Sequence, residues 1–89
     1  MRKNQAMKHR VAVVALDGVV AFDLGVPPQV FGAARDSTGE PLYGVRVCGS
    51  PLRSTAGFAV VPDHDLGIVA TADTVIVPGV GAGSGLTGT

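Results

Sequence analysis

The chain has 89 residues, with seven Lys plus Arg, seven Asp plus Glu, a formal net charge of zero and one cysteine. This length allows one small domain, and a single cysteine excludes a scaffold held together by internal disulfides. No apolar run approaches the roughly 20 residues of a membrane-spanning helix. We therefore expect a cytoplasmic protein with no membrane partner.

The positive charge is concentrated at the start of the chain. Four of the seven basic residues lie within residues 1–10, and from Val11 onward three basic residues face seven acidic ones. A body with this acidic balance lacks the basic face of a nucleic-acid-binding protein. We expect residues 1–10 to be a flexible basic N-terminus and the chain to bind no nucleic acid directly.

The first two predicted elements are a strand and a helix. Residues 11–16 form a continuous apolar, β-branched run, which is typical of a strand buried on both faces. Residues 22–35 predict a helix in which Asp23 accepts hydrogen bonds from the free N-terminal amides. Two prolines at 27–28 are expected near the first turn, and an apolar stripe is expected to face the core; its members are Val26, Val30, Phe31 and Ala34.

The remaining elements continue the alternation. The pattern predicts a strand over 42–48, a turn-rich hairpin-like segment over 49–57, a short strand over 58–61, a short helix or turn over 63–72 and a strand over 74–78. Strands that alternate with helices favour an α/β domain with a parallel sheet. No helix pattern follows the last strand, and residues 80–89 are glycine-rich and expected to be disordered. We therefore expect residues 11–79 to be the first half of a larger domain.

The glycine-rich end does not match a phosphate-binding loop. Ser84 stands where G-x-G-x-x-G needs its third glycine, and no lysine follows Lys8 to complete a P-loop. Ser84 also lacks the first glycine of a G-x-S-x-G nucleophile motif. We expect no cofactor and no catalytic residue in this chain.

Three side chains outside that segment could carry chemistry. Cys48 follows Arg46 by two residues, which could favour a thiolate, but a buried structural thiol is the favoured interpretation. His64 lies between two aspartates, where capping of the next turn by one of them is favoured over a metal site. Asp23 lies just past the carboxyl end of the first strand, where open α/β sheets bind ligands; a plain helix cap is an equal alternative.

Several segments resemble a known family. The stretches HRVAVVALDGVVAFDLGVPPQVFGAARD, PLYGVRVC, STAGFAVVPDHDL and TADTVIVPG are similar to the N-terminal part of GlxA-type regulators, which are bacterial AraC-family transcription factors. The more specific parts are D-L-G-x-P at 23–27 and A-G-F-x-V-x-P-D-H at 56–64. The resemblance covers roughly residues 9–79.

The resemblance implies a ThiJ/PfpI-like domain of the class I glutamine amidotransferase-like fold, with an incomplete flavodoxin-like parallel sheet that stops before the nucleophile-elbow strand. It implies that Asp23 matches the acidic position beside the superfamily nucleophile and that Gly79 matches the strand-end glycine of the oxyanion-binding turn. These two residues are the expected ligand-binding positions. The full-length relative is expected to bind a small metabolite, to form a homodimer and to read DNA through a distal helix-turn-helix.

Two other functions stay open. The chain could be the N-terminal piece of a ThiJ/PfpI-type amidase, isonitrile hydratase or deglycase, although Cys48 is on the wrong strand to be the nucleophile of such an enzyme. It could also be a small interaction module that pairs an open strand edge with a partner. The regulator fragment is the preferred hypothesis, without DNA-binding, catalytic or metal-binding residues in this chain.

Overall fold

The computed structural model describes residues 8–81. Its elements are β1 (His9–Val14), α2 (Ala21–Ala33), β2 (Tyr43–Cys48), β3 (Leu52–Arg53), β4 (Ala59–Val60), the 3₁₀ helix η1 (Leu66–Thr71) and β5 (Thr74–Ile76). Every predicted strand and helix is present, with bounds shifted by one to three residues at most ends. The first strand begins at His9, so two residues of the predicted flexible N-terminus belong to the sheet.

The main sheet has three parallel strands in the order β2-β1-β5. β1 lies at the centre, with Val11 beside Val45 and Thr74, and Val13 beside Val47 and Ile76. A separate antiparallel pair, β3-β4, forms the predicted hairpin. The prediction of an α/β domain with a parallel sheet is therefore confirmed.

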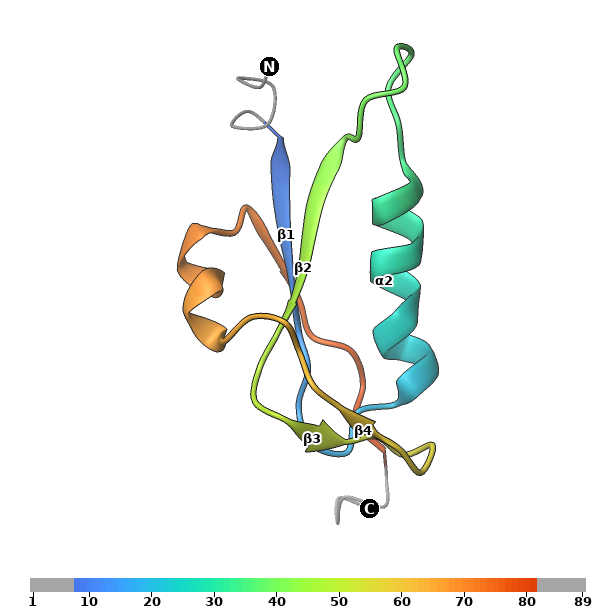
Figure 1. Cartoon of the computed structure of the whole chain (residues 1–89), viewed down its shortest axis with the longest axis vertical. Coiled ribbons are helices and arrows are strands. Elements are labelled where there is room, and N and C mark those ends of the chain that lie inside the picture. The colour runs from blue at the N-terminus through green and yellow to red at the C-terminus, as the bar shows by residue number, and fades with distance from the viewer. Residues whose placement is uncertain (1–7, 82–89) are drawn as a thin grey trace.

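β1 supplies most of the core. Its residues from Val11 to Val14 are all buried, and Val13 is fully so. Helix α2 covers one face of the sheet and η1 lies on the other (Figure 1), which is why the run is apolar at consecutive positions and does not alternate. Each such Val contributes about 1.5–3 kcal/mol by leaving water.

Two apolar clusters divide this core. On the η1 side, Ala12, Val14 and Cys48 are covered by three partly buried residues of η1 and the position after it. At the carboxyl end of β1, Ala15, Val19 and Leu52 pack together. The second cluster joins the sheet to the hairpin, so it fixes the loops at that end.

Helix α2 differs from its prediction in two respects. It begins one residue earlier, after Val20. Pro27 and Pro28 lie inside it as its seventh and eighth residues, not in its first turn, and each removes one backbone donor from the helix. Its apolar residues also surround it. The ring of Phe31 packs edge to face against that of Tyr43, with 4.9 Å between the ring centroids, but Val26 and Val30 are exposed. The expected single inward stripe is therefore wrong for these two valines.

Candidate ligand site at the carboxyl ends of the strands

The strand order creates a switch point between β1 and β5. The chain leaves β1 through α2 to reach β2 on one side, and returns to the other side of β1 as β5. Loops that follow two neighbouring strands therefore diverge at their carboxyl ends. Open α/β sheets bind ligands in the crevice that this divergence produces.

Backbone hydrogen bonds join three loops at this place. The Gly18 N–H donates to the Arg53 carbonyl at 2.8 Å, and the Thr55 N–H donates to the Val19 carbonyl at 2.9 Å. The Val20 N–H donates to the Gly79 carbonyl at 2.9 Å. The segment after β1 is thus held against both the hairpin and the segment after β5, which positions the start of α2.

The two ligand-binding residues expected from the sequence lie together there. Asp23 is the third residue of α2 and Gly79 follows β5. A Cβ placed on Gly79 would lie 3.2 Å from Oδ2 of Asp23, so the carboxylate lies against the glycine backbone. A glycine at 79 leaves this approach open.

Asp23 was expected to cap its helix, but it does not. The residue before α2 is Val20, and no side chain makes a capping bond there. The Asp23 carboxylate is exposed and makes no hydrogen bond to another residue within 8–81. It stays in the first turn, near the positive end of the helix dipole, and is therefore available to accept a hydrogen bond from a ligand or to pair with a cation.

The hairpin contributes residues to this end of the sheet that the sequence did not identify. Ser54 is buried; its hydroxyl donates to the Phe58 carbonyl at 3.0 Å and accepts from the Ala56 N–H at 3.2 Å. The side chain of Thr55 lies against Gly81 closely enough that a Cβ there would overlap it. Turn-forming residues predicted the hairpin, but no local sequence pattern predicted that the hairpin packs against Val19.

Cys48 belongs to the core and not to this site. Its side chain is fully buried on the η1 side. Burial raises the pKa of the thiol, and the nearby Asp65 carboxylate raises this pKa further. The interpretation of a structural thiol is confirmed, and Arg46 does not activate it.

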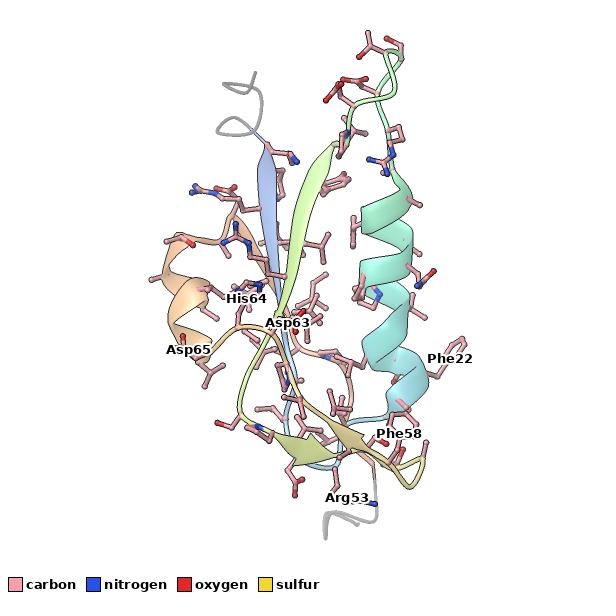
Figure 2. All side chains as sticks on the ribbon, in the orientation of Figure 1. Phe22, Arg53, Phe58, Asp63, His64 and Asp65 are labelled. Atoms are coloured by element: carbon pink, nitrogen blue, oxygen red, sulfur yellow. The ribbon has the colours of Figure 1, made fainter. Side chains whose placement is uncertain are left out.

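The Asp63-His64-Asp65 segment serves as a cap and a connection. Oδ1 of Asp65 accepts from the Gly67 N–H at 2.8 Å at the start of η1, as one interpretation predicted. The His64 carbonyl accepts from the Gly49 N–H at 2.9 Å. Figure 2 shows the three side chains along the segment that leads from the hairpin to η1. Within residues 8–81 no three His, Cys, Asp or Glu side chains gather closely enough to hold a metal ion.

The ends of the chain are described only in part. Val80 forms a bridge with Val19, and the Gly81 N–H donates to the Gly18 carbonyl at 2.8 Å. Two residues of the segment expected to be disordered therefore continue the fold. Ser84 and the rest of residues 82–89, like residues 1–7, lie outside the described residues. No helix among residues 8–81 is long and apolar enough to cross a membrane.

Comparison with known proteins identifies the fold. No family model matches the chain. An uncharacterized protein in the cpoL 5′ region of Streptomyces lividans is 40% identical over 72 residues, which are 80% of this chain and 51% of that protein. The DJ-1 superfamily protein Atu0886 of Agrobacterium tumefaciens superposes with a TM-score of 0.57 at 21% identity, over 91% of this chain and 43% of that protein.

Both matched proteins are longer than this chain. The chain spans about half the length of the Streptomyces protein and less than half of the Agrobacterium protein. The chain therefore has the α/β fold seen in part of this DJ-1 superfamily protein.

Proposed function

We propose that residues 11–79 provide one side of a small-molecule pocket in a ThiJ/PfpI-type domain, with Asp23 and Gly79 at its floor. The observation that carries this proposal is the contact between the Asp23 carboxylate and Gly79 at the switch point between β1 and β5. A carboxylate accepts hydrogen bonds only. The bound group is therefore a hydroxyl, an amide N–H or an ammonium group.

We further propose that this domain is the ligand-sensing or dimerisation part of a GlxA-type AraC-family regulator. The segments D-L-G-x-P at 23–27 and A-G-F-x-V-x-P-D-H at 56–64 support the regulator. In such a protein another region of a longer polypeptide binds DNA, since the residues from Val11 onward carry more acidic than basic groups. A homodimer and a cytoplasmic location belong to the same proposal.

The second candidate is a ThiJ/PfpI-type enzyme. The position of Asp23 favours it, because the resemblance places an acidic residue beside the nucleophile at this position. The thiol of Cys48 is buried on the η1 side of the sheet and is not that nucleophile. In the enzyme hypothesis the cysteine therefore comes from another part of a longer polypeptide.

Ligand binding is tested by thermal unfolding of the chain in the presence of small amines, amides and polyols. Ligands that bind the folded state raise the midpoint in proportion to RT ln(1 + [L]/Kd). We expect any such rise to disappear in Asp23→Asn for ammonium ligands and to fall in Gly79→Ala, whose methyl group would displace the carboxylate. Asp63→Asn, which changes an exposed carboxylate outside the site, is the matched control. A rise that survives both site variants would contradict the pocket.

The choice between regulator and enzyme is tested by reading the coding sequence downstream of codon 89 in all three frames. A helix-turn-helix pair in any frame supports the regulator. A strand that ends in a cysteine elbow, without helix-turn-helix sequence, supports the enzyme. Unrelated sequence in every frame would overturn both assignments while leaving the binding test of Asp23 and Gly79 intact.

A further inference from the structure

A second hollow lies at the opposite end of the sheet, at the amino ends of β1 and β2 on the face that η1 partly covers. Its volume is about 110 Å³. Three cations line it, Lys8, Arg10 and Arg46, together with the small residues Ala12 and Gly44. These three are most of the basic residues within 8–81, since Arg35 and Arg53 are the remaining two.

The strand register explains why the hollow exists. Arg10 lies beside Gly44, and Ala12 lies beside Arg46. Each long cationic side chain therefore has a small neighbour across the strand pair, and the two small residues leave space between the two arginines. A Cβ on Gly44 would lie 3.6 Å from Cδ of Lys8, so the lysine stem borders the same space.

The charges around the hollow are unbalanced. Asp73 pairs with Arg10, with an Nε–Oδ2 distance of 3.3 Å. Within the described part of the chain, Lys8 and Arg46 form no ion pair. Three cations and one carboxylate leave an excess of two positive charges in one small place. Like charges on neighbouring strands oppose one another, and an anion between them would relieve that repulsion.

The size and charge of the hollow select its ligand. Pockets for drug-sized molecules occupy about 300–1,000 Å³, so this hollow accepts only a small group. A phosphate monoester carries close to two negative charges above its second pKa of about 6, which matches the excess positive charge. Arginine also presents paired donors that fit phosphate oxygens.

We propose that Lys8, Arg10 and Arg46 form a binding site for a phosphate group, either free phosphate or the terminal phosphate of a small metabolite. The site is separate from the Asp23–Gly79 pocket, because the two lie at opposite ends of β1. Binding at one does not depend on the proposed function of the other.

The test is an NMR titration of the ¹⁵N-labelled 89-residue chain with inorganic phosphate and with methyl phosphate at pH 7.5, with ionic strength held constant by sodium chloride. We expect saturable shifts of the backbone amides of residues 10–12 and 44–46. Arg46→Gln should weaken binding roughly tenfold, as expected for loss of one charge-assisted contact. Arg35→Gln, which removes an exposed cation that does not line the hollow, should leave the affinity unchanged.

A second variant separates a shaped site from diffuse attraction. Gly44→Val retains all three cations and fills the hollow, and a β-branched residue suits a strand. We expect it to abolish the saturable shifts while its amide spectrum stays dispersed. Shifts that are linear, equal to those in chloride alone, or unchanged in both Gly44→Val and Arg46→Gln would overturn the proposal. Equal affinity for both ligands supports a metabolite phosphate, and binding of inorganic phosphate alone supports free phosphate.

Discussion

Gly49 is the position at which substitution should most damage the fold. It follows β2 with φ of 141°, a conformation essentially restricted to glycine. A Cβ there would lie 2.6 Å from the carbonyl oxygen of Ala15, which is backbone and cannot rotate away. Gly49→Ala therefore adds a steric overlap to a conformational strain.

The cost can be worked from these two terms. The conformation itself costs about 1–3 kcal/mol for a residue with a side chain. Relief of the overlap must separate Gly49 from Ala15. That movement would disturb the hydrogen bonds from the Ala15 N–H to the Cys48 carbonyl and from the Gly49 N–H to the His64 carbonyl, both 2.9 Å. Each contributes about 1 kcal/mol, so the free energy of unfolding should fall by about 3–5 kcal/mol.

Two other Gly→Ala substitutions provide matched controls. Gly57 has φ of 87° but open space around its Cβ, so Gly57→Ala should cost only the strain of a left-handed residue, about 1 kcal/mol. Gly25 lies inside α2 with nothing near its Cβ. Gly25→Ala should raise stability by about 0.5–1 kcal/mol, because glycine is a poor helix former.

The three variants are compared by urea unfolding followed by circular dichroism. From the highest urea midpoint to the lowest, the order should be Gly25→Ala, the unsubstituted chain, Gly57→Ala and Gly49→Ala. The dependence of the unfolding free energy on urea concentration should be similar in all four. In thermal unfolding, each kcal/mol corresponds to about 4–8 °C for a domain of this size. A loss in Gly49→Ala no larger than that in Gly57→Ala would refute the close approach of Ala15 and Gly49.

Three further predictions test burial and charge. Phe22 is 79% exposed and points away from the sheet at the start of α2 (Figure 2), so Phe22→Ser should change the free energy of unfolding by less than about 0.5 kcal/mol; Leu24→Ala, on the packed side, should lower it measurably in the same urea experiment. Burial holds the pKa of Cys48 above its ordinary value of 9.0. The neutral thiol therefore contributes stability that is fully present below pH 9.0, and this contribution is lost as pH rises through the folded-state pKa. Cys48→Ala should therefore flatten the alkaline fall in stability measured by urea unfolding, and an unchanged slope would contradict this. The hydrogen bond from the Arg10 backbone N–H, followed by the Arg10 side chain, lowers the pKa of Asp73 below 3.8. Its contribution is present above that value and is lost as pH falls through the folded-state pKa, so Asp73→Asn should show a weaker acid dependence below about pH 4.

The sequence predicted most of the elements because their signals are local. A β-branched run flanked by Asp17-Gly18 is sufficient to indicate a buried strand, and alternating strand and helix patterns indicate a parallel sheet. The bounds of β1 differ because pairing decides them. His9 and Arg10 are polar, yet they lie opposite Tyr43 and Gly44 in the ladder.

The face of α2 that packs on the sheet could not be predicted, because its apolar residues do not favour one side of the helix. Apolar residues surround the helix, so periodicity does not select an inward face. Contact with the sheet selects Leu24 and Phe31, and leaves Phe22, Val26 and Val30 exposed. The prolines were expected in the first turn because their missing donors are tolerated there. In the structure the helix begins at Ala21, after Val20, whose N–H donates to the Gly79 carbonyl, and the prolines lie beyond its first turn.

The sequence could predict that the candidate site lies at the carboxyl edge of the sheet, but not which residues make contact there. Asp23 follows the first strand and Gly79 follows the last, and the carboxyl ends of parallel strands meet at one edge. Their contact depends on β1 and β5 being neighbours, a consequence of strand order that no local pattern encodes. The basic hollow was also hidden, because Lys8, Arg10 and Arg46 meet only through the register of β1 and β2.

Val19 shows most clearly why the loops needed the structure. It lies in a turn-rich stretch after β1 and gives no strand or helix signal, yet its side chain is fully buried. Its backbone bridges Ser54 on one side and Val80 on the other, so residues 35 and 61 positions away converge on it. Contacts over such sequence separations arise from chain closure. Val19 therefore connects the loops of the candidate site, although neither composition nor periodicity predicts this role.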